Sequence, residues 1–235
     1  MPRIGNPIRP GLLALILAQA CLAPGAAALD SPAKYGGTPF HDSVYSGGPQ
    51  AIPGRVQCAY YDLGGEGVAF HNPDTRNRGS GMLNPADGTY LNEFRMHEAV
   101  GISYVKYHDA IDDNPFDTVK PAAGQLYVGW TNPGEWFNMT VAVAEAGAYE
   151  IGLLYTSNRG GRVSLDLDGK PLARPIDIVS TWNSAETVPW RQWHHWNLIK
   201  NIATVKLPRG VSVLTFHIVS EGNMNLAYLD FRQVN

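Results

Sequence analysis

The sequence predicts an all-β domain built as a β-sandwich. About ten short segments with strand character recur between turn signals, which is the pattern of a sandwich rather than of alternating strands and helices. The 25 glycines and 17 prolines indicate many turns, and no segment has the period of an amphipathic helix of normal length. With 44% hydrophobic and 17% charged residues, the 235-residue chain has enough apolar residues for a sizeable core and does not have the composition of a disordered protein.

The N-terminus has the features of a secretory signal peptide. Arg3 and Arg9 precede an uncharged apolar segment of residues 11–23, and Ala26-Ala27-Ala28 offers the small residues of a cleavage site. The apolar segment is too short to span a bilayer, and no later segment reaches spanning length. We therefore expect residues 1–28 to be a signal peptide cleaved after Ala28, and the mature chain to be secreted to the periplasm or the extracellular space.

The two cysteines bear on the same question. Cys21 follows Ala18-Gln19-Ala20, so a lipoprotein anchored through Cys21 is the alternative, although the leucine usual three positions before such a cysteine is missing. Cleavage after Ala28 removes Cys21 and leaves Cys58 without an intramolecular partner. Cys58 lies in an apolar segment with strand character and is predicted to be a small buried residue.

Beyond the signal, residues 29–51 are rich in glycine, proline and serine and are predicted to be an irregular lead-in or linker, and residues 52–235 to form one β domain. Its strands are expected at residues 55–61, 126–130, 135–143, 148–155, 163–167, 176–179, 193–198, 202–207, 211–219 and 226–234. Residues 71–124 are the least regular part, with one further strand expected within residues 101–107. A long loop region inside a compact domain is usually functional or ordered by a ligand.

Asn132-Pro133-Gly134 is predicted to be the turn of a hairpin that joins residues 126–130 to residues 135–143. Proline presets one turn angle and glycine tolerates a positive one. This turn places Trp130 at the edge of a loop and Trp136 within a strand.

The tryptophans indicate sugar binding. All six lie between Trp130 and Trp196, and two of them, Trp130 and Trp190, lie beside turns. An indole at a loop edge exposes a flat apolar face on which the C–H bonds of a sugar ring stack, and amides such as those of Asn223 and Asn225 bind the hydroxyls. The alternative for each tryptophan is simple packing in the core.

Several stretches, taken in order, carry a resemblance to a known family. They are Ile52-Pro53-Gly54-Arg55-Val56-Gln57, Gly64-Gly65-Glu66-Gly67-Val68-Ala69-Phe70-His71, Tyr127-Val128-Gly129-Trp130 with Gly134-Glu135-Trp136, Ala146-Gly147-Ala148-Tyr149, Leu207-Pro208-Arg209-Gly210-Val211 and Asn225-Leu226-Ala227-Tyr228-Leu229-Asp230-Phe231. Over residues 53–231 the chain resembles carbohydrate-binding module family 6, as found attached to agarases and other glycan hydrolases. The resemblance implies a lectin-like jelly-roll β-sandwich of the galactose-binding type that binds glycans and performs no chemistry.

The resemblance also implies where the glycan binds. In the family, the usual cleft lies in the loops at one end, where two aromatics grip a sugar and an asparagine binds its hydroxyls. Carried over, the aromatics fall on Trp130 and on Trp190, the second because Val188-Pro189-Trp190-Arg191-Gln192-Trp193 resembles the family's Gly-Gly-Trp-Gln-Thr-Trp. The asparagine falls on Asn225. Glu66 is expected to assist from a nearby turn, while Trp136 and Trp193 are expected to be core.

Three departures from the family pattern affect these expectations. The family's opening Glu-Ala-Glu, whose acids help hold a structural calcium, is replaced by Gln57-Cys58-Ala59, which leaves Asp230 and the neutral Gln57 as candidate calcium ligands. Residues 71–124 are longer than the family's connection, with Gly101 where an aspartate is common, so this insertion is a candidate to reshape or cover the cleft. Residues 181–195 are longer as well.

Two other functions stay open. A glycan hydrolase or lyase using acids of the 71–124 insertion would need two carboxyl groups at a defined separation. Spacing selects no pair among the acids of the chain, the candidates being Asp62, Glu66, Glu93, Asp112, Asp113 and Glu135. A structural or adhesive surface domain would use the tryptophans for packing alone.

Charge and histidine spacing narrow the ligands further. The formal net charge is −3 and no basic run occurs, which argues against a nucleic-acid partner and suits a neutral ligand. The adjacent His194 and His195 would point to opposite faces of a strand, so they are poorly placed to share a zinc ion. The expected partners are a polysaccharide or oligosaccharide ligand and, in function, separately encoded glycan-degrading enzymes.

Overall fold

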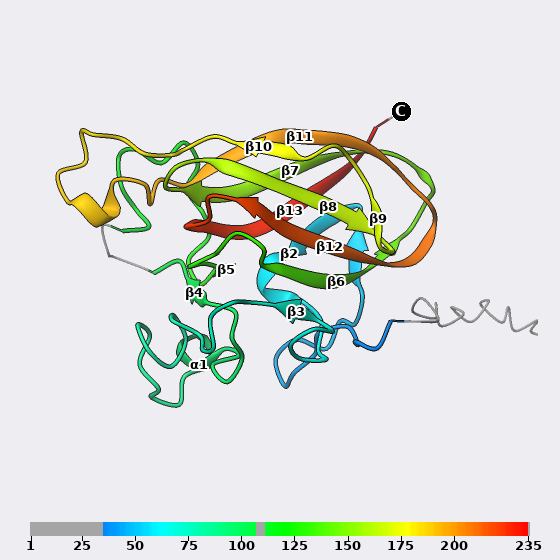
Figure 1. The fold of residues 1–235 in the computed structure, drawn as a ribbon, viewed down its shortest axis with the longest axis horizontal. Helices are drawn as coiled ribbons and strands as arrows, with labels where there is room; N and C mark the ends of the chain where they lie inside the picture. Colours follow the sequence, from blue (N-terminus) through cyan, green and yellow to red (C-terminus); the bar gives the residue numbers. More distant parts are fainter. Residues whose placement is uncertain (1–34, 107–110, 235) are drawn as a thin grey trace, which may run out of the picture.

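The computed structural model describes residues 35–106 and 111–234, and their strands form two β-sheets packed face to face (Figure 1). The first sheet follows the order β1 (Gln50–Ile52), β6 (Trp136–Val143), β12 (Gly210–Ser220), β8 (Gly161–Leu167) and β10 (Ile176–Ile178), with β3 (Phe70–His71) on β6 and β9 (Lys170–Pro171) on β8. The second follows the order β11 (Asn197–Leu207), β7 (Gly147–Ser157), β13 (Met224–Val234), β5 (Leu126–Val128) and β4 (Ile102–Tyr104), with β2 (Gly54–Gln57) on β13. The predicted all-β jelly-roll sandwich is confirmed.

The core lies between the two sheets, where alternate residues of each strand face inward. Phe137 of β6 and Phe216 of β12 are opposite each other in the register and stack with ring centroids 5.3 Å apart. Ile151 and Leu153 of β7 face them from the second sheet and are fully buried. Burial of these apolar side chains is the main driving force for the fold.

Residues 126–143 do not form the predicted hairpin. β5 belongs to the second sheet and β6 to the first, so residues 129–135 carry the chain from one sheet to the other. Turn residues and strand alternation set where the chain bends and which side chains face inward, but they do not choose the partner strand. β5 pairs with β4 and β13, and these partners are remote in sequence.

Other predicted boundaries shift for local reasons. The expected strands at residues 193–198 and 202–207 are one strand, β11, whose register is irregular between Ile199 and Ala203. The expected strand at residues 55–61 ends at Gln57, and Cys58 begins the short 3₁₀ helix η1 (Cys58–Tyr60) as a fully buried free thiol.

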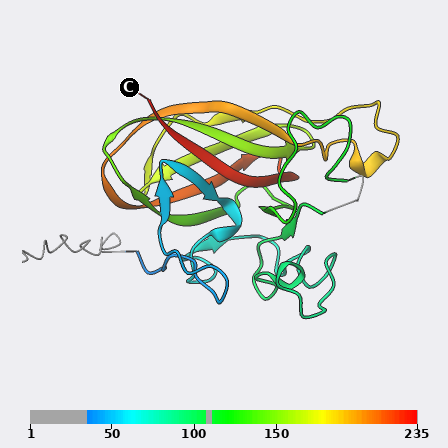
Figure 2. The same cartoon turned by 180° about the vertical axis from the view of Figure 1, so that it is seen from behind.

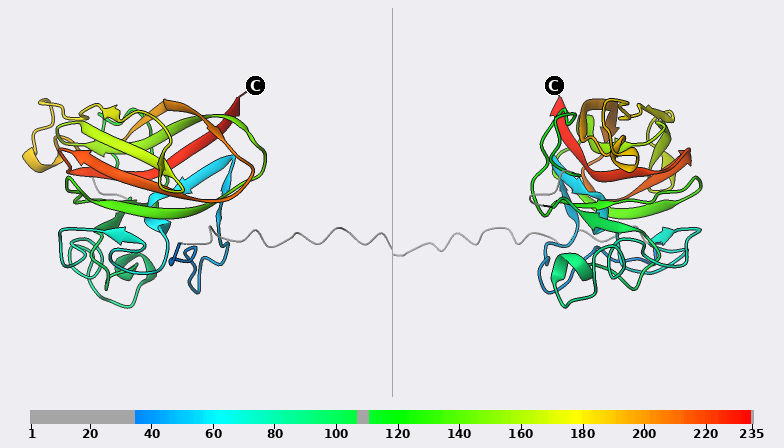
Figure 3. Two further views of the ribbon diagram at one scale, coloured as in Figure 1. Left: turned by 45° about the vertical axis from the view of Figure 1, so that its right-hand side comes forward. Right: turned by 90° about the vertical axis from the view of Figure 1, so that its left-hand side faces the viewer.

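Residues 72–101 and residues 35–49 of the lead-in pack along one side of the sandwich, beside β3 and β4 (Figures 2 and 3). This part contains one helical turn, α1 (Tyr90–Glu93). Arg95 fixes it to the sandwich by donating to the backbone oxygens of Tyr61 and Asp62 and pairing with Glu98. Phe40 of the lead-in is buried against it, so residues 35–49 are irregular in backbone but part of the packed domain.

Val105 and Val119 pack on the outer face of the second sheet. Val105 packs there with Trp196, Tyr127 and Leu154, all almost fully buried. This smaller apolar cluster explains why β7 and β13 are buried on both faces over much of their length. In the described part of the chain, no helix is long and apolar enough to cross a membrane.

Candidate functional site

Loops from both sheets meet at one end of the sandwich and enclose a cleft of about 410 Å³. Figure 1 shows the loop between β10 and β11, the start of β13 and the segment before β5 at that end. Three of the sequence-predicted site residues lie together in this cleft, namely Trp130, Trp190 and Asn225. The other lining residues are Leu83, Lys106, Ile111, Asp112, Tyr127, Trp193, His194 and Asn223.

Trp130 stands on the connection between β5 and β6 with φ of 53°, in the left-handed region that residues other than glycine rarely adopt. Its ring lies directly over two glycines of the insertion. A Cβ added to Gly79 would come within 2.8 Å of Trp130 Cζ3, and one added to Gly101 within 3.1 Å of Cε3. The departure at Gly101 therefore has a physical reason, because a side chain at this position would displace the indole.

Glu135 supports the connection that carries Trp130 through hydrogen bonds. It is fully buried; its Oε2 accepts from the Asn132 backbone N (2.9 Å) and its Oε1 from Asn72 Nδ2 (3.0 Å). Burial raises the pKa of Glu135 to about 8. Asn132 Nδ2 in turn donates to the Trp130 carbonyl (3.1 Å), so one network fixes the backbone that carries the indole.

Asn225, at the start of β13, is 3% exposed. Its Nδ2 donates to Thr156 Oγ1 (2.9 Å) and lies 3.4 Å from His194 Nδ1. A Cβ on Gly129 would come within 2.8 Å of Asn225 Oδ1, so glycine at 129 makes room for this amide. In the described part of the chain nothing donates to Asn225 Oδ1, so this oxygen can accept a hydrogen bond from a ligand in the cleft.

Trp190 and Trp193 belong to the loop of residues 179–196, which contains the short 3₁₀ helix η2 (Pro189–Arg191). The Trp190 side chain is 57% exposed. Trp193, predicted to be core, is only partly buried and lines the cleft, with its ring 4.2 Å from that of His194. The buried tryptophan of this segment is instead Trp196, which lies in the smaller apolar cluster with Val105, Tyr127 and Leu154. Trp136, also predicted to be core, is partly exposed on β6, with its ring 6.4 Å from that of His71.

The insertion supplies the charged groups of the cleft, Lys106 and Asp112. The sequence did not indicate Lys106, and it gave Asp112 only as one of several candidate acids, not as a residue of the cleft. Lys106 Nζ donates to buried Asn84 Oδ1 (2.8 Å) and lies over the Tyr104 ring. Asp112 is 3% exposed, and its Oδ1 accepts from Trp196 Nε1 (2.9 Å). Such contacts join residues far apart in sequence, so no local pattern signals them.

His194 faces the cleft as a neutral ring. Burial lowers its pKa to about 4, and the positive charge of Lys106 acts in the same direction. Around neutral pH His194 Nδ1 therefore has a free lone pair for Asn225 Nδ2, and the ring adds no charge to the cleft.

Glu66 lies apart from the cleft lining. Its Oε1 is 2.5 Å from His71 Nδ1, and its Oε2 accepts from the Asn72 backbone N (3.1 Å). These contacts brace the turn before β3, and the structure brings Glu66 together with none of the other predicted site residues.

The candidate calcium ligands do not make a suitable site. Gln57 Oε1 accepts a hydrogen bond from Gln125 Nε2 (2.7 Å). Asp230 lies opposite Arg55 in the β2–β13 register, and its carboxylate is 3.9 Å from the Arg232 guanidinium. Calcium takes several oxygen ligands and favours carboxylates. One carboxylate beside the Arg232 guanidinium and one neutral amide oxygen do not fit that chemistry. Among residues 35–106 and 111–234 no cluster of three His, Cys, Asp or Glu is placed to hold a metal.

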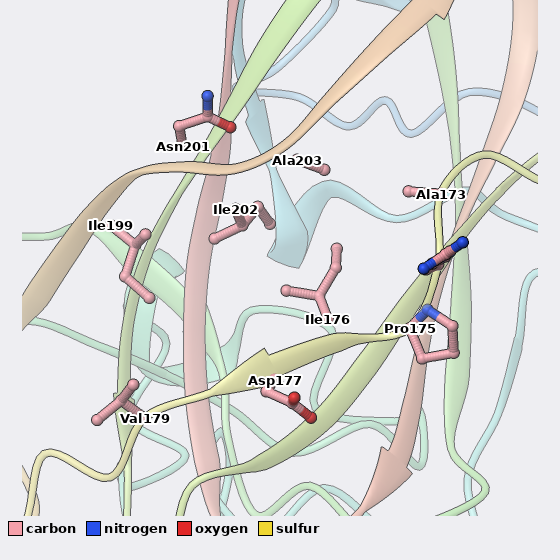
Figure 4. A pocket seen from close by; sticks show the side chains of 10 residues that line it. Ala173, Pro175, Ile176, Asp177, Val179, Ile199, Asn201, Ile202 and Ala203 are labelled. Carbon is pink, nitrogen blue, oxygen red and sulfur yellow. The ribbon is translucent and has the colours of Figure 1, made fainter.

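A larger hollow of about 510 Å³ lies between the edge strands β10 and β11. Ile176, Ile199 and Ile202 project into it (Figure 4). It contains no aromatic ring and is mostly aliphatic, so it lacks the stacking platforms that the smaller cleft provides.

A jelly-roll β-sandwich with an aromatic cleft in the loops at one end defines a class of glycan-binding modules. The family model for "Carbohydrate binding module (family 6)" matches residues 109–234. The chain therefore belongs to carbohydrate-binding module family 6, and carbohydrate binding is its general function. The match begins after most of the 71–124 insertion, so the resemblances noted at residues 52–71 lie outside it.

Solved structures with a similar fold include other carbohydrate-binding modules. A family 35 module from Clostridium thermocellum is 23% identical over 50% of this chain and 86% of its own, with a TM-score of 0.39. The module CsCBM6-3 from Clostridium stercorarium, solved with cellobiose, is 11% identical over 80% and 100%, with a TM-score of 0.46. A module from Cellvibrio mixtus lichenase 5A, solved with cellotriose, is 19% identical over 58% and 88%, with a TM-score of 0.39. No curated protein sequence matches the chain.

Proposed function

We propose that the chain binds a polysaccharide or oligosaccharide, without catalysis, in the cleft between Trp130 and Trp190. One observation carries the proposal: two tryptophans from separate loops meet in one cleft with an asparagine whose Oδ1 receives no hydrogen bond from the described residues. Ligand sites typically combine apolar and aromatic walls with a few placed polar groups, and this cleft has that composition.

Each lining group has a role in this proposal. Trp130 and Trp190 present indole faces to the C–H faces of sugar rings. Asn225 Oδ1 accepts a hydrogen bond from a sugar hydroxyl, while Asn223 and the Lys106 ammonium are placed to donate to ring oxygens or hydroxyls.

The non-catalytic part of the proposal is supported by the carboxylates. A glycosidase uses two carboxyl groups that flank the scissile bond. Among the described residues lining the cleft, Asp112 is the one carboxylate, and it already accepts from Trp196 Nε1 (2.9 Å) and the Lys106 backbone N (3.3 Å). Those contacts give Asp112 a structural role, because they hold the insertion to the end of the loop that precedes β11.

The expected affinity is modest. An aromatic contact contributes about 1 kcal/mol beyond area burial, so two platforms and a few hydrogen bonds predict a Kd in the micromolar range or weaker. Such affinity is useful when several modules engage one polymer.

Affinity electrophoresis and tryptophan fluorescence of the mature chain against a panel of polysaccharides test the proposal, with Trp130→Ala beside the wild type. Loss of a central aromatic side chain typically costs about 2 kcal/mol of binding free energy. The variant should therefore bind the glycan that retards the wild type about 30-fold more weakly. The control is Val219→Ala, an exposed apolar residue of β12 outside the cleft lining, which should bind as the wild type does. Release of reducing sugar by the wild type would contradict the non-catalytic assignment. Absence of retardation by every glycan would contradict binding.

The proposal includes secretion. The signal peptide, the Ala28 cleavage site and Cys21 fall outside the described residues. N-terminal sequencing of the exported protein should find Leu29 first, whereas a chain that starts at a lipidated Cys21 would show a lipoprotein instead.

A further inference from the structure

A second polar hollow lies on the other side of the loop that carries Trp190. It measures about 180 Å³ and is lined by Phe116, Thr118, Ser180, Trp182, His195 and Asn197, among others. His194 lines the cleft and the adjacent His195 lines this hollow, so the two sites lie on different sides of the same loop. Small-molecule pockets commonly measure roughly 300–1,000 Å³, so this one suits a single ring or a chain end rather than a long ligand.

Trp182 gives this hollow an exposed aromatic face that is held in place. Its side chain is 51% exposed, although Nε1 donates to Gln192 Oε1 (3.2 Å) and the backbone N donates to Ser180 Oγ (3.1 Å). The backbone N of Asn183 also donates to the Gln192 carbonyl (2.7 Å), which ties the two sides of the loop together. An indole whose rotamer is already fixed loses little freedom when a ligand stacks on it.

His195 provides an acceptor without a donor. The residue is 3% exposed, and its Nδ1 lies 2.8 Å from the Thr181 carbonyl, to which it donates. In the neutral ring Nε2 then carries a lone pair, and this buried atom has no hydrogen-bond partner in the part of the chain that the structure describes. Buried polar atoms are almost always paired, so an unpaired one beside a polar hollow points to a donor supplied from outside.

The remaining polar groups suit an uncharged ligand. Asn197 Oδ1 accepts from Thr118 Oγ1 (2.7 Å), and Ser180 Oγ donates to the Asn158 carbonyl (2.6 Å). No Asp, Glu, Lys or Arg is among the described residues that line the hollow. Hydroxyls and amides beside an indole form the chemistry that binds neutral sugars rather than anions or metal ions.

We propose that this hollow is a second sugar-binding site, in which Trp182 stacks on one neutral pyranose ring and a hydroxyl of that ring donates to His195 Nε2. The Phe116 ring, whose centroid is 4.9 Å from that of His195, also lines the hollow. The ligand class rests on the proposed function of the cleft, but the site itself uses none of the cleft residues. Two sites on one module would strengthen its retention on a polymer.

The test follows the indole N–H signals of the mature chain by nuclear magnetic resonance, each assigned through a Trp→Phe variant. The probes are cellotetraose, xylotetraose and a β-1,4-linked galactotetraose, added to the wild type and to Trp130→Ala. We expect one probe to shift the Trp182 signal in both proteins, with dissociation constants that agree within about threefold, and to move the His195 Nε2 resonance. In the Trp130→Ala background, Trp182→Ala should lower residual polysaccharide retention at least tenfold. Trp182→Phe keeps a ring face and should retain most of it.

Three outcomes would overturn the second site. If only the signals of Trp130, Trp190 and Trp193 shift, the cleft binds sugar but the hollow does not. If the Trp182 signal shifts in the wild type but not in Trp130→Ala, it reports a change transmitted from the cleft. If no probe shifts any indole, the hollow and the proposed function fail together. Because Trp182 is largely exposed, its variants should fold, and circular dichroism checks that they do.

Discussion

The two walls of the cleft are built in different ways. Trp130 stands on a short connection between the sheets, and its backbone is tied to buried Glu135 while its ring rests on Gly79 and Gly101. Trp190 stands far out on the loop of residues 179–196, with more than half of its side chain exposed. Many of the hydrogen bonds near its tip stay within the loop, such as the ion pair of buried Glu186 with Arg191 (3.0 Å).

This difference in support predicts which wall contributes more of the binding free energy. A rigid aromatic wall loses little conformational freedom when a sugar stacks on it, whereas an exposed side chain on a long loop must be ordered first. We therefore expect Trp130 to supply most of the affinity, and Trp190 to adjust to the shape of the glycan.

The largest expected effect is on the stability of the fold and comes from Glu135, the buried residue that supports the Trp130 wall. The pKa of Glu135 is raised from its ordinary value of 4.5 to about 8, so the folded state keeps a proton that the unfolded state loses. Its contribution to stability is fully present below about pH 4.5 and is lost as the pH rises to about 8, a change on the order of a few kcal/mol. Denaturant unfolding of the wild type and Glu135→Gln across this range measures it.

The slope with pH is the informative quantity in that experiment. Glutamine has one acceptor oxygen, so it accepts from either Asn132 N or Asn72 Nδ2 and loses the other hydrogen bond. The variant should be less stable at low pH yet lose less stability on going from pH 4.5 to pH 8. Parallel curves for the two proteins would show that Glu135 does not titrate in this window.

Gly101→Ala tests the contact between the insertion and the first wall. The new Cβ would come within 2.8 Å of the Gly129 carbonyl oxygen and 3.1 Å of Trp130 Cε3. Such overpacking costs about 1–3 kcal/mol of stability, and a displaced indole should weaken glycan binding about tenfold. Gly134→Ala is a comparison for backbone strain alone, because its φ is 90° and nothing lies within 4 Å of a Cβ there. It should lower stability while leaving the indole contact intact, and equal losses of affinity in both variants would contradict the role of Gly101.

Much of the sandwich is predictable from sequence because alternation along a strand directly reports which side chains face the core. Residues 148–155 and 211–219 fall within β7 and β12 for that reason. The pairing of β5 is different, since its partners lie in β4 and β13, and nothing local in residues 126–143 encodes them. The position of a turn could be predicted, but not that the chain changes sheets there.

The candidate site likewise contains residues that the sequence could predict and residues that it could not. Trp130 and Asn225 flank loops beside recognisable strands, so a family pattern reaches them. Lys106 and Asp112 enter the cleft only because the insertion folds back over β11 and β13, and Trp193 was placed in the core although Trp196 takes that position. An irregular segment has no sequence periodicity, so the sequence does not predict which of two nearby tryptophans is buried.

Trp190→Ala tests the second wall of the cleft, as Trp130→Ala tests the first. Removing this exposed indole should cost about 1 kcal/mol of binding free energy, near fivefold in Kd, and little stability. Isothermal titration with the retained glycan, set beside Trp130→Ala, measures both walls under one condition. A larger loss for Trp190 than for Trp130 would reverse the assignment of the rigid wall as the dominant one.

The smallest expected effect lies between the walls, at His194. Its pKa is lowered from 6.5 to about 4, so the ring is neutral in the folded state over the range in which an unfolded histidine titrates. The stability that this neutral ring contributes is present above about pH 6.5 and is lost as the pH falls towards 4.

Glycan affinity should be flat from pH 5 to pH 8, because His194 Nδ1 keeps its lone pair towards Asn225 Nδ2. Below about pH 4 both groups would present donors, and Asn225 would turn away from the sugar hydroxyl. Titrations of the wild type and His194→Gln from pH 3.5 to pH 8 check this, and a drop in wild-type affinity centred near pH 6.5 would show that burial does not hold His194 neutral.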